Sequence, residues 1–232
     1  LTIETGDARP MLAGPGDQMV VLDPAGPRTL DVLSVTNDAL DVTLYRVTPD
    51  DWTDFLTYFD GYAQSGSDRP AAPGTEAWRG KVDPEGDRDA LVTVSIDLAP
   101  ALTDGLGQVV AVVSPPDWKP EDEEWQNRPV IRWIQATNIG LAVLADGAEV
   151  TAWATSLADG APLAGLDVSL VPNGGSGRTD AGGLVSLAPL PEGTDQTWPP
   201  AGAVIARSGG DTAFAPRNYS GTWTKTPQAQ TL

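Results

Sequence analysis

The 232-residue chain contains no cysteine and no histidine. Without cysteine it has no disulfide framework, no thiolate nucleophile and no cysteine-ligated zinc site. Without histidine it lacks the commonest general base and the commonest metal ligand of proteins. These two absences exclude much of known catalytic and metal-binding chemistry.

Long hydrophobic runs are also absent. No stretch of about 18 uncharged apolar residues occurs, and the opening LTIETGDARP lacks the basic and apolar regions of a signal peptide. The sequence therefore predicts neither a membrane-spanning nor a targeting segment. Because the chain does not begin with Met, we expect it to be a segment of a longer protein, with any targeting signal or lipid anchor outside it.

Positive charge is scarce. The chain has 14 basic and 32 acidic residues and a formal net charge of -18, which repels phosphate backbones and anionic lipids. Nucleic acid is therefore not an expected partner. Residues 1–116 hold 19 of the acidic and 7 of the basic residues, so most of the acidity belongs to the first half.

Glycine and proline are plentiful, with 25 Gly and 21 Pro separating short apolar runs that are rich in Val, Leu and Trp. This pattern predicts an all-β chain of many short strands. Its length suits two antiparallel β-sandwiches of roughly 100 residues each. For the first, residues 1–116, we predict a long surface loop at 63–88 and strands at 20–22, 30–35, 40–47, 90–98 and 107–114, with 1–20 as a further edge.

One helix interrupts this pattern. In TPDDWTDFLTYFDGY the apolar period changes from two to about 3.6. Thr48 is a suitable N-cap, Pro49 fits the first turn, and Gly61 is suited to the end. The sequence predicts one short helix near 49–60, with an apolar face of Trp52, Phe55, Leu56 and Phe59.

A Pro-rich acidic stretch, PPDWKPEDEEWQNRP, separates the two halves, and we predict a linker at 117–129. The second sandwich is expected at 130–216, with Asp146 and Gly147 as a hairpin turn. Residues 217–232 are expected to connect to a following domain. The seven strands predicted for the second sandwich, at an immunoglobulin-like spacing, are 130–136, 140–145, 148–156, 166–171, 183–189, 203–208 and 212–216.

Carboxylates alternate in DPEGDRD as they do in calcium loops, at Asp83, Glu85, Asp87 and Asp89. The EF-hand pattern requires Gly at the sixth position and Glu at the twelfth, where this chain has Arg88 and Val94. A solvated acidic turn is therefore the better interpretation.

Two other acidic groups have similar alternatives. Asp50, Asp51 and Asp54 suggest the acid pair of a glycosidase, but carboxylates in a first helical turn are favoured electrostatically. The run Glu121–Glu124 is either a solvated linker or a docking patch for a basic partner. GGSGRTDAGG has no phosphate-loop context, and no serine has an activating base. We therefore predict no catalytic, cofactor-binding or metal-binding residues and no enzyme activity.

Eight tryptophans raise the alternative of a carbohydrate-stacking platform. Trp133 and Trp153 lie in alternating strands, and buried aromatics dominate the packing of small sandwiches. We expect framework, with Ile131, Trp133 and Val143 in the core. Two exposed tryptophans aligned on one open sheet face would instead favour an adhesin-like or carbohydrate-binding tandem.

The order of several motifs resembles a known family. RWIQATNIGL, VTAWATSLADGAPLAGLDVSL, TDAGG and ARSGGDTAFAP follow one another as in macroglobulin-type domains of bacterial α2-macroglobulin-like proteins. The preceding VTN, LYRVTP and DDW are similar to the domain before it. The resemblance covers about Met19 to Pro216.

This resemblance implies a macroglobulin or immunoglobulin-like sandwich tandem within a large extracytoplasmic protease trap. Such a trap is cleaved in a bait segment, changes conformation and entraps proteases, often through a Cys–Gln thioester. Because this chain has no Cys, the resemblance implies only scaffold here. The implied partners are neighbouring domains of the parent chain and, through the whole protein, proteases.

Overall fold

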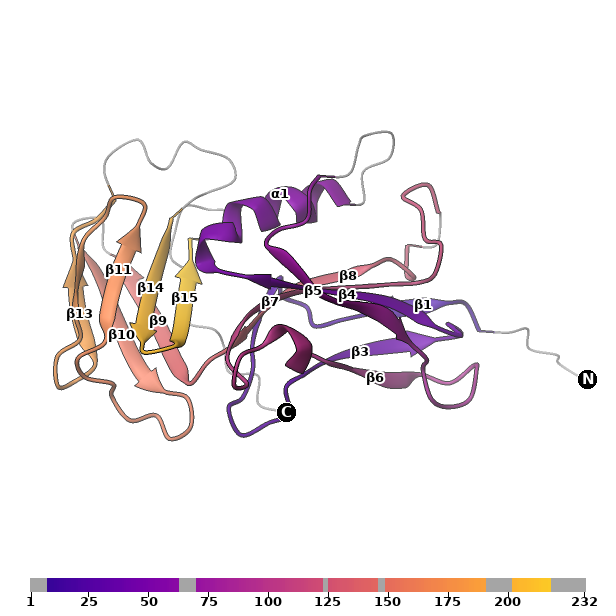
Figure 1. The fold of residues 1–232 in the computed structure, drawn as a ribbon, viewed down its shortest axis with the longest axis horizontal. Coiled ribbons are helices and arrows are strands. Elements are labelled where there is room, and N and C mark those ends of the chain that lie inside the picture. Colours follow the sequence, from indigo (N-terminus) through magenta and orange to yellow (C-terminus); the bar gives the residue numbers. More distant parts are fainter. Residues whose placement is uncertain (1–7, 63–69, 123–124, 146–148, 191–201, 218–232) are drawn as a thin grey trace, which may run out of the picture. The chain divides into compact units, whose positions relative to one another are not determined.

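The computed structural model describes residues 8–62, 70–122, 125–145, 149–190 and 202–217. It divides into two compact units, each built from two β-sheets (Figure 1). One unit comprises Leu1–Leu22, Pro27–Val47 and Tyr58–Gln135, and the other comprises Asp23–Gly26, Thr48–Thr57 and Ala136–Leu232. The predicted all-β tandem of sandwiches is confirmed. Within the described ranges, no helix is long and apolar enough to cross a membrane.

The first unit pairs a three-stranded sheet of order β1-β3-β6 with a five-stranded sheet of order β2-β8-β7-β4-β5. Residues 1–20 supply the expected further edge as β1 of the three-stranded sheet, while β2, which matches the strand predicted at 20–22, is an edge of the five-stranded sheet. β2 runs parallel to β8, an exception to the antiparallel pairing predicted for the chain. The strand bounds are β1 (Met11–Ala13), β2 (Met19–Val21), β3 (Thr29–Val35), β4 (Leu40–Val47), β5 (Thr75–Val82), β6 (Val92–Asp97), β7 (Gly107–Ser114) and β8 (Val130–Ala136).

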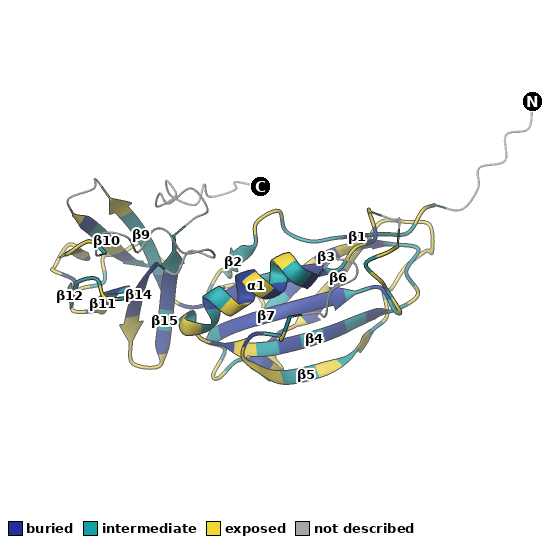
Figure 2. Cartoon of the chain, turned by 90° about the horizontal axis from the view of Figure 1, so that it is seen from above, coloured by how far each residue is buried: buried dark blue, intermediate teal, exposed yellow. Residues whose placement is uncertain are grey.

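Alternating apolar residues fill the space between these two sheets. Leu30 and Val32 of β3 meet Val42 and Leu44 of β4 in one buried cluster. β7 is buried along nearly its whole length, including residues on its other face, as Figure 2 shows. The five-stranded sheet is therefore covered on both faces near its centre, which explains why β7 is an almost unbroken apolar run.

The strand β5 corrects one prediction, because it lies within the expected loop at 63–88. It pairs with β4 at the edge of the five-stranded sheet, and most of its residues are exposed or half-buried. Trp78 packs against the core, and Gly80 leaves room for its ring: a Cβ there would lie 2.5 Å from the indole. A charged edge strand with little apolar alternation gives a weak sequence signal.

The strand β8 corrects a second prediction. The sequence prediction assigned residues 130–136 to the second sandwich, but β8 lies between β2 and β7 in the first unit. The expected linker at 117–129 accordingly precedes a strand of the first unit, and the Leu12 N–H donates to the Gln126 carbonyl at 2.9 Å. Both faces of β8 carry large apolar residues, with Ile134 on the face toward the inter-sheet core and Trp133 on the other face. An apolar strand fits either sandwich, so its pattern alone does not assign it.

The predicted helix is confirmed as a 3-10 turn, η1 (Pro49–Asp51), followed by α1 (Trp52–Tyr62). It ends two residues later than expected, so Gly61 lies in its last turn. Thr48 is the N-cap residue, and its N–H and hydroxyl donate to one carboxylate oxygen of Asp51 at 2.7 and 3.0 Å. A second 3-10 turn, η2 (Ala99–Ala101), follows β6. The buried residues of α1 are Trp52, Phe55, Leu56, Tyr58 and Tyr62.

The second unit packs a three-stranded sheet of order β13-β10-β9 against a four-stranded sheet of order β12-β11-β14-β15. β12 is a strand that the sequence did not predict. The predicted hairpin turn at 146–147 lies outside the described residues. The strand bounds are β9 (Ile139–Ala145), β10 (Val150–Ser156), β11 (Asp167–Val171), β12 (Ser176–Arg178), β13 (Leu184–Leu187), β14 (Ala203–Ser208) and β15 (Asp211–Pro216).

Candidate interaction surface

The outer face of the sheet β13-β10-β9 carries three of the large apolar side chains that the second unit leaves exposed, Leu144, Trp153 and Leu184. Along β10 the small apolar residues Val150, Ala152 and Ala154 enter the core, so the alternate residues point outward. Strand register then places the outward residues of β9 and β13 beside them. We call this the Trp153 face, and its members are Gly140, Ala142, Leu144, Thr151, Trp153, Thr155, Leu184 and Ser186.

The centre of the Trp153 face is apolar. Trp153 is 44% exposed and lies directly opposite Ala142 on β9 and Leu184 on β13. Leu184 is also exposed, as is Leu144 toward one end of β9. At the other end, a Cβ on Gly140 would lie 3.1 Å from the Leu157 side chain, so this exposed leucine extends the face. This contiguous apolar surface is a candidate contact site.

Three of the four polar side chains of the face, Thr151, Trp153 and Ser186, are engaged in hydrogen bonds. The Trp153 indole N–H donates to the Gly182 carbonyl at 3.2 Å. One Glu149 carboxylate oxygen accepts hydrogen bonds from the hydroxyls of Thr151, at 3.3 Å, and Ser186. These bonds fix the ring and the rim, and they leave few donors to orient a polar ligand.

This chemistry favours a protein partner over a sugar. A sugar site combines an aromatic plane with hydrogen-bonding groups that fix the ring hydroxyls. Here the residues opposite Trp153 on the two neighbouring strands are Ala142 and Leu184, and its indole N–H already donates to a backbone carbonyl. An apolar centre with a small polar rim is the anatomy of a protein–protein contact.

The other tryptophans form no platform with Trp153 in the described ranges. Trp133 is fully buried and donates its indole N–H to Gln108 Oε1 at 2.9 Å, which confirms it as a core residue. Ile131 is also buried, and Val143 is half-buried against the second core. Trp125 is 71% exposed but belongs to the first unit. The expectation of a core position is therefore wrong for Trp153, whereas the exposed Trp125 lies in the stretch that the sequence predicted as a linker.

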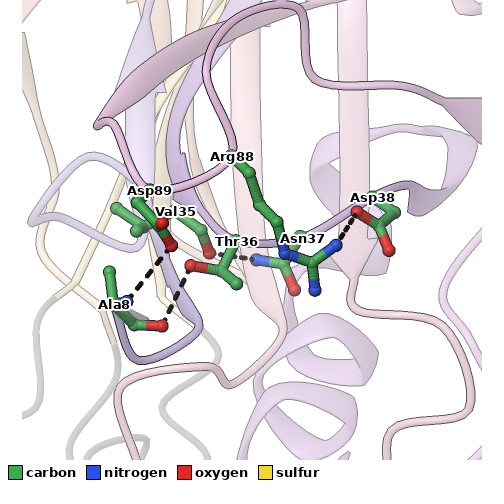
Figure 3. A network of polar contacts seen from close by, with 7 residues as sticks. All are labelled: Ala8, Val35, Thr36, Asn37, Asp38, Arg88 and Asp89. Atoms are coloured by element: carbon green, nitrogen blue, oxygen red, sulfur yellow. Dashed lines mark hydrogen bonds and ion pairs between the residues drawn. The ribbon is translucent and has the colours of Figure 1, made fainter. Parts of the chain in front are cut away.

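The acidic turn at 83–89 takes part in polar contacts between chain segments (Figure 3). Asp89 accepts a hydrogen bond from the Ala8 N–H at 3.1 Å, and Arg88 pairs with Asp38 at 2.8 Å. Thr36 donates its hydroxyl to the Ala8 carbonyl and its N–H to the Arg88 carbonyl. The turn thus joins the N-terminal segment to the end of β3, a structural role.

An asparagine pair continues this network. Asn37 donates to the carbonyls of Met11 and Val35 and to Asn127 Oδ1, at 3.0, 3.3 and 3.0 Å. Asn127 donates in return to Asn37 Oδ1 at 3.2 Å and is buried. This pair holds the end of the acidic stretch against β1 and β3.

The remaining acidic candidates act locally. Asp51 caps η1, and Asp50 and Asp54 are exposed at the start of the helix. Asp122 accepts a hydrogen bond from the Lys119 N–H at 2.7 Å, while residues 123–124 lie outside the described residues. In the ranges that the structure describes, no three acidic side chains gather as a metal site would require.

No family model matches the sequence, and no curated protein matches it in sequence. Solved structures do resemble the fold. A crystal structure of native alpha-2-macroglobulin from Escherichia coli spanning domains MG0-NIE-MG1 has a TM-score of 0.62 and 19% identity, covering 93% of this chain and 66% of that one.

Two further structures from Escherichia coli resemble the fold of this chain. One, spanning domains NIE-MG1 of native alpha-2-macroglobulin, has a TM-score of 0.61 and 19% identity and covers 91% of this chain and 99% of the other. Trypsin-activated alpha-2-macroglobulin has a TM-score of 0.62 and 19% identity over 89% of this chain, which spans 14% of that protein. The resemblance to macroglobulin-type domains is thus confirmed in fold, and the chain shares the fold of the bacterial alpha-2-macroglobulin segment spanning domains NIE-MG1.

Proposed function

We propose that this chain is a non-catalytic scaffold segment of a bacterial α2-macroglobulin-like protease inhibitor. The observation that carries the proposal is the match over nearly the whole length of both chains to a segment spanning domains NIE-MG1. We assign the first unit to the position of NIE and the second to that of MG1. Since sequence identity is 19%, the support comes from fold and element order.

The residue chemistry supports a scaffold role. The carboxylates that sequence analysis considered for metal or acid–base work act as caps and segment ties where their bonds are described. A Cys–Gln thioester has no place in a chain without Cys. Bait cleavage and covalent capture would therefore belong to other parts of the parent protein, and this segment would support the conformational change that follows cleavage.

The Trp153 face supports the same proposal, because a scaffold domain must contact its neighbours. Its apolar centre and occupied polar groups suit a neighbouring domain of the parent chain. The proposed location is extracytoplasmic, where a protein of this kind meets foreign proteases. Fractionation of source cells with an antibody against the segment tests that location.

The mass of the native protein tests the function. The antibody should detect a species far above the 24.2 kDa of this chain in source cells. Mild treatment with trypsin should shift its mobility on a native gel, because bait cleavage triggers a conformational change. Trypsin inactivated beforehand by a covalent serine reagent is the control and should leave the band in place. A stable native species near 24 kDa would contradict the proposal.

A further inference from the structure

The outer face of the sheet β12-β11-β14-β15 holds a shallow open cavity of about 400 Å³. Its lining comes from three adjacent strands, which Figure 2 shows side by side: residues 167–169 of β11, 176–178 of β12, and Arg207 of β14. All of these residues belong to the second unit. The cavity is separate from the Trp153 face, which belongs to the other sheet of this sandwich.

Strand register places one carboxylate between two guanidinium groups. Asp167 lies directly opposite Arg178 on β12 and directly opposite Arg207 on β14. Arg178 donates Nε to Asp167 Oδ1 at 2.7 Å and Nη2 to Oδ2 at 3.3 Å. The bidentate bond satisfies Asp167 and raises the pKa of Arg178 further above its ordinary value.

Arg207 makes no such bond to Asp167, although the two residues lie opposite each other. It is exposed and forms no ion pair or hydrogen bond through its side chain within the ranges that the structure describes. The cavity therefore has a surplus of one positive charge, in a chain whose formal net charge is -18. Ser169 and Ser176 add two hydroxyl groups to the lining.

We infer that this cavity is a docking site for an Asp or Glu side chain of an acidic protein segment. The free guanidinium of Arg207 offers a planar fork of donors that matches a carboxylate, and the serine hydroxyls can donate beside it. Phosphate fits less well, because its second negative charge would lie close to Asp167. This inference does not depend on the proposed function.

An NMR titration of the ¹⁵N-labelled 232-residue chain tests the inference. The probe is a blocked hexapeptide of alternating Gly and Glu, and inorganic phosphate and the matching Gly–Lys peptide are run beside it. We expect saturable shifts of the Ser169, Ser176 and Gly177 amides and of Arg207 Nε with the Glu peptide alone. Arg207→Ala should weaken binding about fivefold, the upper range for one exposed ion pair.

A second substitution should increase the affinity for the Glu peptide. Asp167→Asn frees Arg178 and removes the competing negative charge, so it should tighten binding of the Glu peptide about threefold. Its side chain is 67% exposed, so we expect the variant to fold. Arg207→Lys keeps the charge without the planar fork and should retain part of the affinity. The matched control is Arg79→Ala, which removes an exposed arginine paired with Glu76 in the first unit and should change nothing.

Three results would overturn the inference. One is the absence of saturable shifts at the cavity residues. Another is phosphate binding at lower concentration than the Glu peptide. The last is an equal loss of affinity from Arg79→Ala and Arg207→Ala, which would show that only the overall charge matters.

Discussion

Asp211 is a buried carboxylate that holds the entry into β9 of the second unit. Its Oδ1 accepts the Thr137 hydroxyl at 2.6 Å, and its Oδ2 accepts the Asn138 N–H at 2.9 Å. Asp211→Ala leaves both donors without this partner, and Thr137 is almost fully buried. We expect the free energy of unfolding to fall by about 1–3 kcal/mol, the cost of leaving one buried donor, the Thr137 hydroxyl, without its partner.

Urea unfolding followed by far-UV circular dichroism measures this loss. Asp87→Ala is the control, because Asp87 is an exposed aspartate whose backbone carbonyl, which the substitution keeps, accepts the Ala90 N–H. It should change stability by less than about 0.5 kcal/mol. Equal effects of the two substitutions would show that the Asp211 bonds are unimportant for stability.

Two tryptophans offer a matched comparison of buried and exposed positions. Trp133→Phe removes a bond to Gln108 and leaves a cavity in a fully buried site, so we expect a loss of about 1–3 kcal/mol. Trp153→Phe changes a half-exposed ring and should cost less than about 1 kcal/mol. Calorimetric unfolding of the two variants checks the difference. A larger loss at Trp153 would mean that its face contributes to the fold of the isolated chain.

At the scale of elements, the turn before β13 depends on a glycine. Gly183 has φ +78°, and a Cβ there would lie 2.3 Å from the Ala154 carbonyl oxygen, a backbone atom. That close approach is imposed by the Ala154 N–H, which donates to the Gly183 carbonyl at 2.8 Å. Gly160 has a similar φ of +73°, but nothing lies within 4 Å of its Cβ position.

Alanine substitutions at Gly160 and Gly183 distinguish the cost of backbone strain from that of a steric clash. Gly160→Ala should cost about 1 kcal/mol, the strain of a left-handed alanine. Gly183→Ala should cost at least about 2 kcal/mol more, because the backbone beside Ala154, where β10 pairs with β13, must also move. Thermal unfolding midpoints of the two variants give the comparison. Equal costs would mean that the turn at Gly183 relaxes without loss.

The helix and the strands differ in how far the sequence could predict them. The helix was predictable because its signals are local: apolar residues at helical spacing follow Thr48, whose bonds to Asp51 stay within one turn. β5 was not, because its stability comes from pairing with β4 and from Trp78 folding over Gly80. β8 was recognised as a strand, but its apolar pattern does not say which sheet receives it.

The Trp153 face was predictable only in part. In VTAWATS, Trp153 alternates with small apolar residues and shares its side of the strand with two threonines, which indicates an outward position. Its apolar neighbour Leu184 comes from another strand, and that register is not readable from local pattern. The cavity beside Arg207 likewise depends on the register of three strands.

For the whole molecule, the balance of charge predicts how salt affects stability. A net charge of -18 creates self-repulsion in the folded state. The attraction that opposes this repulsion is weak, because the ion pairs described in the structure involve exposed side chains, and such pairs contribute little to stability. Salt screens both the repulsion and the attraction, so the stronger of the two decides the sign of the effect. We therefore expect added salt to stabilise the chain.

Calorimetric scans at neutral pH in NaCl from about 10 mM to about 1 M measure this effect. At about 0.15 M the screening length is already about 8 Å, so most of the rise in the unfolding midpoint should occur below that concentration. A rise that continues linearly to high salt would instead indicate strengthened apolar burial, which strongly excluded salts produce more effectively. A falling midpoint at low salt would show that the exposed ion pairs outweigh the repulsion, and Arg178→Ala should then remove part of that fall.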